Sequence, residues 1–307
     1  MLLNEGIEKF IKSREAICEI STVTHYKNSI KYFMEFITST MENVPDLEDI
    51  SGDILNNFVN YLRKKPKNQN HPFIPSTNEN IKNKTIKTYC LDVVSMFNWF
   101  YEKYFIQDKI TDGFVMPQEE NISVVPLSVE EVKAIDDCFN LTTKYGCRNL
   151  AIIHGLLDQG MRLKEICNLK VYDIDFVAGY ILIKGIRKRN DRVIPLSDVF
   201  RNYISEFINT YRGECLDDYV FHNLNGHQLS SDSVKGIFRR LQKNNGLERV
   251  NAQLLRHTFA ISFLCSGGSL VMCQFYMGHA DISSTQKYVH LLNNYKSNIY
   301  VLDKVFF

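Results

Sequence analysis

The 307-residue sequence lacks any apolar run that approaches the roughly 18 to 20 residues of a membrane-spanning helix. Residues 1–12 also lack the pattern of a secretory signal peptide. Both absences argue against a membrane protein, and we expect a cytoplasmic location. Hydrophobic residues make up 45% of the chain and charged residues 23%, a composition that is typical of globular domains.

Motifs for metal and nucleotide binding are missing as well. The eight cysteines are scattered and include no C-x-x-C pair, which suits reduced thiols and argues against a zinc site. The sequence has neither a glycine-rich phosphate loop nor an acidic metal-binding cluster. We therefore expect no metal ion and no cofactor.

An excess of positive charge is nearly absent too, because the formal net charge at pH 7 is only +1. Taken alone, this value argues against a protein that binds nucleic acid. Phosphate contacts are local, however, and basic residues gather in four short segments. These are Arg63, Lys64, Lys65 and Lys67; Lys82, Lys84 and Lys87; Lys184, Arg187, Lys188, Arg189 and Arg192; and Arg239, Arg240 and Lys243. A single cluster is commonly a solvated face, but four clusters beside the motifs described below favour a segmented DNA-contacting surface.

Apolar residues recur at helical spacing through the first hundred residues. We expect helices within residues 5–41, at 53–65 and at 83–104. The stretch between the last two is rich in Asn, Lys and Pro and is typical of a loop. The sequence thus predicts an all-helical N-terminal domain over residues 1–107, followed by a linker at 108–127.

The second domain, residues 128–307, begins with a helix start signal. Ser128 can cap a helix, and Glu131 stands three residues later as its partner in a capping box. We expect helices near 129–140, 147–158, 198–211, 231–244, 255–265 and 284–293, and strands at 180–183 and 192–196. The predicted fold class is therefore mainly α, with a helical N-terminal domain and an α-rich second domain that contains a small antiparallel β-sheet.

Side chains suited to phosphate chemistry recur in the second domain. Arg162 lies in the segment Gln-Gly-Met-Arg-Leu-Lys-Glu, and an Arg-His-Thr triplet occupies residues 256–258. A Gly-His pair follows at 278–279, and Tyr288 comes nine residues after that histidine. A tyrosine attacks a phosphodiester only where cations neutralise the phosphate and a hydrogen-bond donor stands beside it. Arginine provides a bidentate fork that fits two phosphate oxygens, and histidine can donate to another position.

Two arginines, a histidine and a tyrosine in this order resemble the tyrosine recombinase family, also called the phage integrase family. The resemblance is strongest over residues 126–288, while the N-terminal domain matches only the size and helical layout of that family's core-binding domain. It implies that Tyr288 attacks the phosphorus and forms a 3′-phosphotyrosyl bond. Arg162 and Arg256 would clamp the scissile phosphate, and His279 would donate to a nonbridging oxygen or orient the site.

The same resemblance implies a lysine in the turn between the two strands, where it protonates the leaving 5′ oxygen. The usual distance of that lysine from the proline of the following strand, counted back from Pro195, favours Lys188. The Lys184-Gly185 pair resembles the family's Lys-Gly turn and keeps Lys184 as the alternative.

One position of the catalytic set departs from the family pattern. The family commonly has histidine three residues before the second arginine, where this chain has Gln253. An amide can donate a hydrogen bond to phosphate but cannot take up the tyrosine proton as a base. The resemblance therefore leaves the acceptor of that proton unassigned.

The function implied is that of a site-specific DNA recombinase acting in integration, excision or resolution. No cofactor is needed, because the phosphotyrosyl bond retains the energy of the broken phosphodiester. Expected partners are double-stranded DNA with short inverted-repeat core sites and further copies of the chain, as a tetramer in the synapse. One alternative is a DNA-binding regulator with weakened catalysis, which only Gln253 favours. Another is an enzyme similar to a type IB topoisomerase, whose size and Gly-His to Tyr spacing fit less well.

A dense apolar segment, residues 299–307, ends the sequence. Chain termini are usually frayed and polar, so we expect this segment to be covered. It resembles the terminal segment that this family docks in a neighbouring subunit, and we expect the same here. The alternative is that the segment folds back onto its own domain.

Overall fold

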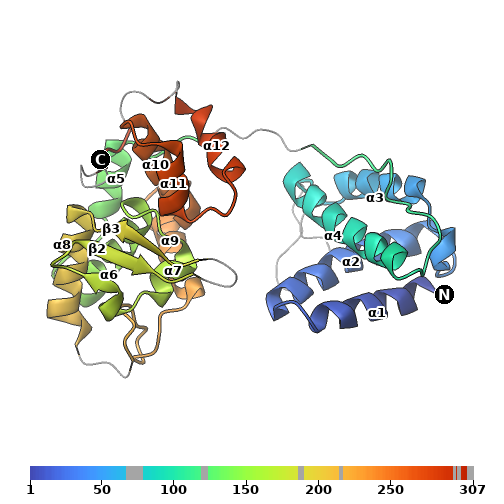
Figure 1. Cartoon of the computed structure of the whole chain (residues 1–307), viewed down its shortest axis with the longest axis horizontal. Coiled ribbons are helices and arrows are strands. Elements are labelled where there is room, and N and C mark those ends of the chain that lie inside the picture. Colours follow the sequence, from blue (N-terminus) through green and yellow to red (C-terminus); the bar gives the residue numbers. More distant parts are fainter. Residues whose placement is uncertain are drawn as a thin grey trace. The chain divides into compact units, whose positions relative to one another are not determined.

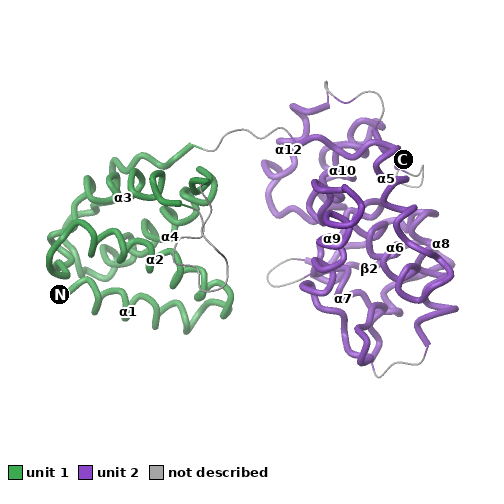
Figure 2. The backbone as a smooth tube through the Cα atoms, turned by 180° about the vertical axis from the view of Figure 1, so that it is seen from behind, with its two compact units in different colours: residues 1–122 green, residues 123–307 purple. Residues whose placement is uncertain are grey.

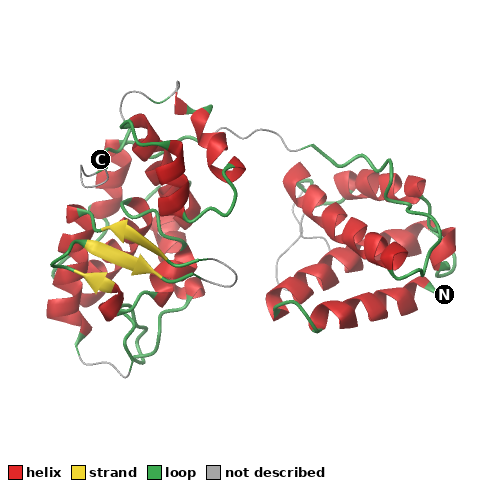
Figure 3. Cartoon of the chain, viewed as in Figure 1, coloured by secondary structure: helices red, strands yellow, loops and turns green. Residues whose placement is uncertain are grey.

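The computed structural model describes residues 1–66, 79–118, 124–185, 190–213, 217–292, 295 and 299–302. The chain divides into two compact units, residues 1–122 and 123–307, each with a hydrophobic core of its own (Figure 2). Helices dominate both units, and the described sheet belongs to the second (Figure 3). The predicted fold class is confirmed. None of the described helices combines the length and the hydrophobicity that crossing a bilayer requires.

The helices of the first unit pack together (Figure 1), and their buried apolar side chains form one core. Its elements are α1 (Leu3–Glu15), α2 (Ile20–Thr40), the 3-10 helix η1 (Leu47–Asp49), α3 (Gly52–Lys64) and α4 (Asn83–Glu102). Phe33 of α2 packs nearly perpendicular to the rings of Phe58 and Phe97, with centroids 5.2 and 5.7 Å away. Such pairs stabilise a core beyond the burial of their area. The chain after α4 stays on this core as far as Met116.

The second unit combines helices with a three-stranded antiparallel sheet (Figure 1). Its elements are α5 (Val129–Asp136), α6 (Lys144–Leu157), α7 (Leu163–Asn168), η2 (Val171–Asp173), β1 (Ile174–Asp175), β2 (Tyr180–Ile183), β3 (Arg192–Pro195), α8 (Asp198–Glu206), η3 (Phe207–Arg212), α9 (Ser231–Asn244), α10 (Ala252–Cys265), α11 (Leu270–Met277) and α12 (Ser283–Val289). Ile181 of β2 lies opposite Ile174 of β1 and Ile194 of β3. All three isoleucines are buried, so this face of the sheet covers the core.

Helices α6 and α10 pack against each other at the centre of the second unit. Every residue of α6 from Gly146 to Leu157 is buried. In α10 the residues from Leu254 to Leu264 are buried with the exception of His257. A helix that is buried all round is a rigid core element, and α10 can therefore hold a functional side chain in a fixed position.

Hydrogen bonds fix the chain where it enters the second unit. The predicted capping box is confirmed, because the Glu131 N–H donates to Ser128 Oγ at 3.2 Å and the Ser128 N–H donates to Glu131 Oε2 at 2.9 Å. The N–H of Leu127 donates to Thr258 Oγ1 at 2.9 Å. Thr258, the last residue of the Arg-His-Thr triplet, thus anchors the entering chain to α10.

Residues 299–302 lie on their own unit. The Tyr300 N–H donates to the Leu127 carbonyl at 3.2 Å, and the Tyr300 hydroxyl donates to Asp158 Oδ1 at 2.7 Å. Leu302 is buried in the same core. In this structure residues 299–302 therefore follow the alternative, in which the segment folds back onto its own domain. Residues 303–307 lie outside the described part of the chain.

Candidate active site

Arg162 lies at the N-cap of α7, and Glu165 holds it there. The Arg162 N–H donates to Glu165 Oε2 at 2.7 Å, and its Nη1 donates to Glu165 Oε1 at 2.9 Å. Its Nη2 donates to the carbonyl oxygen of Gly278, far along the chain. The side chain stays 19% exposed, so a ligand can reach the guanidinium group.

Arg256 approaches the same place from the core helix α10. Its guanidinium group donates to the carbonyl oxygens of Gly160 and Met277, the residue before Gly278. Burial and the charge of Arg162 lower the pKa of Arg256 to about 9, and the group is still a cation at neutral pH. Two guanidinium cations that repel each other in a buried site favour an anionic ligand beside them.

A buried ion pair supports the two arginines. Arg192 of β3 donates to both carboxylate oxygens of Glu165, at 2.9 and 2.8 Å, and its Nε donates to the Tyr276 carbonyl at 2.9 Å. Burial by itself raises the pKa of Glu165, but the hydrogen bonds and charge of Arg192 lower it to about 2. Glu165 is thus an ionised acceptor for two arginines. The assignment of Arg192 to a DNA-contacting cluster is wrong, because its guanidinium group is buried and paired.

Gly278 lets these arginines approach the end of α11. Its φ of 60° lies in the left-handed region, which favours glycine. A Cβ atom at this position would lie 2.8 Å from Nη1 of Arg162 and 2.8 Å from Nη1 of Arg192. Both conformation and space therefore require the glycine of the Gly-His pair.

His279 presents a neutral imidazole to the same site. Its Nδ1 lies 2.8 Å from Thr285 Oγ1, which fixes the orientation of the ring. Burial, and then the charges of Arg256 and Arg162, lower the pKa of His279 to about 3. In the tautomer whose Nδ1 accepts the Thr285 proton, Nε2 carries a hydrogen that can be donated to a phosphate oxygen.

Tyr288 of α12 is the buried phenol of the site, with 1% of its surface exposed. Its Oη lies 2.5 Å from Nδ1 of His257. Burial raises the pKa of Tyr288 to about 12, although the nearby charge of Arg256 opposes this rise. The sequence indicated no role for His257, because spacing along the chain does not reveal a contact between residues 31 positions apart.

The two lysine candidates differ in their surroundings. Lys188 lies outside the described residues, as do Arg187 and Arg189. Lys184 follows β2, where its ammonium group lies 3.5 Å from Asp173 Oδ1 and 4.9 Å from the centroid of the Tyr172 ring. The ammonium group of Lys184 is thus held by an acidic and an aromatic neighbour.

Gln253 is exposed at the start of α10. It lines an open pocket of about 660 Å³ together with Arg239 of α9 and Leu163, the neighbour of Arg162. Arg239 and Arg240 are both exposed. The structure therefore brings a predicted catalytic amide and a predicted DNA-contacting arginine to one pocket.

In the first unit the predicted DNA-contacting residues differ in exposure. Those that are exposed are Arg63, Lys64, Lys82 and Lys84. Lys87 is half-buried, whereas Lys65 is buried and forms an ion pair with Glu35 beneath the rings of Tyr32 and Tyr61. The prediction that Lys65 contacts DNA is wrong, because its charge is enclosed within the fold.

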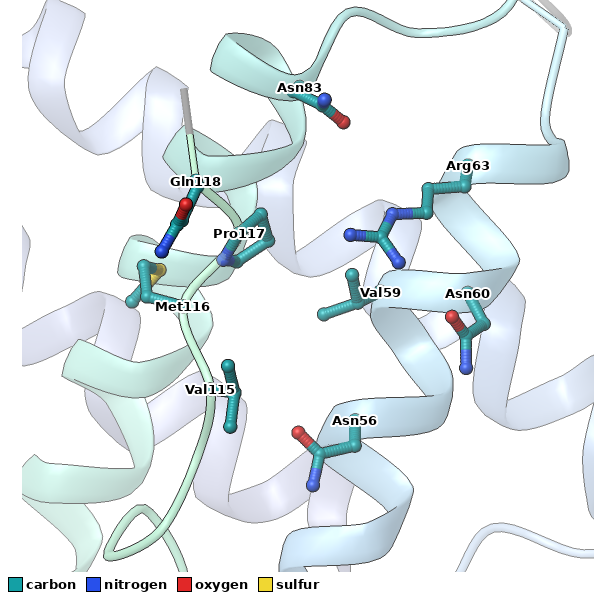
Figure 4. Close-up of a pocket in the computed structure, with 9 residues that line it drawn as sticks. All are labelled: Asn56, Val59, Asn60, Arg63, Asn83, Val115, Met116, Pro117 and Gln118. Carbon is teal, nitrogen blue, oxygen red and sulfur yellow. The ribbon is translucent and has the colours of Figure 1, made fainter. Parts of the chain in front are cut away.

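Arg63 also lines a pocket of about 730 Å³ in the first unit (Figure 4). Asn56, Asn60 and Arg63 follow one another along α3, and Asn83 and residues 115–118 line the other sides. Amide and guanidinium groups are the side chains that most often read base edges in DNA. The pocket therefore places polar groups of the right chemistry beside the exposed basic residues.

Comparisons with known proteins identify relatives of both units. The chain matches the model of the phage integrase family over residues 126–294 and that of a phage integrase SAM-like domain over residues 2–111. A similar protein is tyrosine recombinase XerD of Halalkalibacterium halodurans, which is 23% identical over 97% of this chain and 97% of its own length.

Two solved structures of lambda integrase share the fold. One is a dimer bound to a COC′ core site, with a TM-score of 0.73 and 17% identity over 94% of this chain and 95% of that chain. The other is a tetramer bound to a Holliday junction, with a TM-score of 0.69 and 16% identity over 92% of this chain and 79% of that chain. The family match over residues 126–294 includes Arg162, Arg256 and Tyr288, and the chain therefore belongs to the phage integrase family of tyrosine recombinases.

Proposed function

We propose that this protein is a site-specific DNA recombinase that cuts and rejoins double-stranded DNA through a 3′-phosphotyrosyl intermediate. The observation that carries the proposal is the convergence of side chains from separate elements. Arg162 and Arg256 bind the carbonyl groups at the end of α11, and His279 follows them directly. The positive charge of the nearby Arg256 favours the ionised form of the Tyr288 phenol. A phosphate held by two cations and one neutral donor would thus lie beside a nucleophile.

In the proposed reaction Tyr288 Oη bonds to the phosphorus as the bond to the 5′ oxygen breaks. Arg162 and Arg256 stabilise the charge that develops on the nonbridging oxygens, and the N–H of His279 donates to one of them. Lys188 gives its proton to the leaving 5′ oxygen; we prefer it to Lys184, which Asp173 already engages. A 5′ hydroxyl then gives its proton back to the lysine and attacks the phosphorus, and the bond from phosphorus to Oη breaks to release the tyrosine.

The proposed DNA-contacting residues of both units lie on exposed or half-buried positions or outside the described residues. They are Arg63, Lys64, Lys82, Lys84, Lys87, Arg187, Arg189, Arg239 and Arg240. Arg63 lines the pocket of α3, which would bring its amides to the same DNA. We further propose that the chain works in the cytoplasm, on short inverted-repeat core sites, as a tetramer in the synapse, for which the lambda integrase tetramer on a Holliday junction is the precedent.

A nicked duplex core site, taken from the DNA that neighbours the gene, tests the proposal. The wild-type protein should form a covalent adduct that survives a denaturing gel, because the cleaved fragment diffuses away. Tyr288→Phe should bind the site with unchanged affinity and form no adduct, since only the attacking oxygen is lost. DNA binding without an adduct by the wild type would favour the second candidate, a regulator with weakened catalysis, to which Gln253 points. An adduct formed by the phenylalanine variant would identify another nucleophile.

The same assay decides between the lysines. A 5′-phosphorothiolate leaves as sulfur and needs no proton, so it should restore cleavage by Lys188→Ala. Rescue of Lys184→Ala instead would assign the proton donor to Lys184.

A further inference from the structure

His257 touches the reacting atom of the proposed nucleophile. Its Nδ1 lies 2.5 Å from Tyr288 Oη, and the two ring centroids are 5.5 Å apart. His257 follows Arg256 on α10, and it is the residue of the buried stretch of that helix that is not itself buried. A titratable side chain on a buried helix thus contacts the phenol oxygen.

Other described groups around Tyr288 are poor acceptors for its proton. Arg256 and Lys287 are cations, the latter 5.2 Å from the centroid of the phenol ring. His279 is occupied at Nδ1 by Thr285, and the neighbouring cations disfavour its protonation. Gln253, at the position of the family's histidine, lies in the pocket with Arg239 and carries an amide, which is not a base.

We propose that His257 is the general base for Tyr288, which adds a catalytic residue to the proposed recombinase reaction and rests on that function. In cleavage, Nδ1 takes the proton from Oη while Oη bonds to phosphorus and the bond to the 5′ oxygen breaks. The 5′ oxygen takes its own proton from the lysine. In rejoining, the 5′ hydroxyl returns its proton to the lysine as its oxygen attacks phosphorus, the bond from phosphorus to Oη breaks, and His257 returns its proton to Oη.

The amide of Gln253 explains why another residue must act as the base. The position that is histidine in the resembling family carries an amide here, and the structure places that amide in an exposed pocket with Arg239. The imidazole in contact with the phenol lies four residues later along the same helix. One histidine on α10 therefore takes over the task that the resemblance left unassigned.

Two substitutions of His257 distinguish a general base from a residue that only orients the phenol by a hydrogen bond. His257→Asn keeps a hydrogen-bonding atom near the place of Nδ1 but cannot take up a proton, and His257→Ala removes both. On the nicked core site, both variants should form adduct on the order of 10² to 10⁴-fold more slowly than the wild type, the usual contribution of a general base. Their affinity for the site and their thermal unfolding should match the wild type. His227→Ala, which removes an exposed histidine outside the site, is the matched control and should cleave normally.

Rescue provides the second measurement. Added imidazole should raise the rate of His257→Ala at least about tenfold, within the range that a positioned base contributes, and should leave Tyr288→Phe inactive. The double variant Gln253→His, His257→Asn should recover activity if a base on the neighbouring turn can replace the missing one.

The possible results distinguish a failure of the base assignment from a failure of the proposed function. Adduct formation by His257→Asn at the wild-type rate would overturn the base assignment while leaving the recombinase intact. A slow His257→Ala variant that imidazole fails to rescue would overturn it as well. Absence of adduct from the wild type would instead contradict the proposed function.

Discussion

At the scale of single residues, Glu165, a buried charge of the catalytic unit, residues 123–307, is balanced by one partner that is near in the sequence and one that is distant. Glu165 accepts hydrogen bonds from Arg162 and Arg192, which belong to different elements. Removing one member of such a group leaves an uncompensated buried charge, which costs more than the intact group contributes. Glu165 is therefore a positioning residue: it touches no substrate, but it sets where Arg162 can point.

Because the pKa of Glu165 is lowered in the folded state, the free energy of unfolding should decrease at acidic pH. Its folded pKa of about 2 lies below its ordinary value, so the stabilisation is fully present above about pH 4.3 and is lost as pH falls towards 2. The free energy of unfolding should fall by about 3 kcal/mol through this window. Urea titrations between pH 5 and pH 2 measure it. Glu165→Gln should be less stable at pH 7 and should lack this part of the acid dependence; identical pH slopes for the two proteins would contradict the assignment.

The sequence predicted some features of the site residues and not others. Arg162, Arg256, His279 and Tyr288 were predicted from their order and spacing, and their use in catalysis stays a prediction. Exposure was less predictable, because the partner that encloses Lys65 is Glu35, thirty residues away, and no local pattern announces it.

At the scale of elements, the long helices were predicted, including the fully buried α6 and α10, whereas some short or uniformly apolar elements were not. Helices α4 and α9 have one buried face, and their predicted positions are confirmed. Helix α11, which leads to Gly278, was missed because nearly all of its residues are apolar and no periodicity stands out. Strand β1 has two residues and α7 has six, which is too short for a sequence pattern.

His154 ties α5 to α6 and should make the catalytic unit sensitive to alkali. Its Nε2 lies 2.9 Å from Asp136 Oδ1 and its Nδ1 lies 2.5 Å from Asp158 Oδ2. Burial lowers the pKa of His154, but the two carboxylates raise it to about 9. Because the folded pKa is raised, the stabilisation is fully present below about pH 6.5 and is lost as pH rises through 9.

We expect the free energy of unfolding to fall by up to about 3 kcal/mol between pH 6.5 and pH 9.5. Urea titrations of the catalytic unit measure the change, and His154→Gln is the control that carries no titrating group. A wild-type protein that is as stable at pH 9.5 as at pH 6.5 would show that His154 is neutral in the fold.

At the scale of the whole molecule, the chain has two separate cores. The first unit carries exposed basic residues and the pocket of α3, whereas the second carries the proposed phosphate site together with the exposed Arg239 and Arg240. Each core is complete in itself, so each unit should fold without the other.

A fragment of residues 124–307 should therefore unfold cooperatively and still form the covalent adduct at high protein concentration. Its affinity for DNA should be lower, and log K should fall less steeply with log salt than for the full chain, because fewer phosphates are neutralised. Titrations at several salt concentrations measure both quantities. Equal salt slopes would mean that the first unit contributes no phosphate contacts.

Leu127 joins the two ends of the catalytic unit. Its N–H is bound to Thr258 and its carbonyl oxygen to the N–H of Tyr300, so the chain enters and leaves at one residue. The unit is therefore close to a circular chain whose two ends are joined by hydrogen bonds at Leu127, beside α10. A circular chain can in principle be opened at another exposed site without loss of the fold. The same fold should survive if residues 302 and 124 were bridged by a short peptide and the chain were reopened in the exposed turn at Leu224.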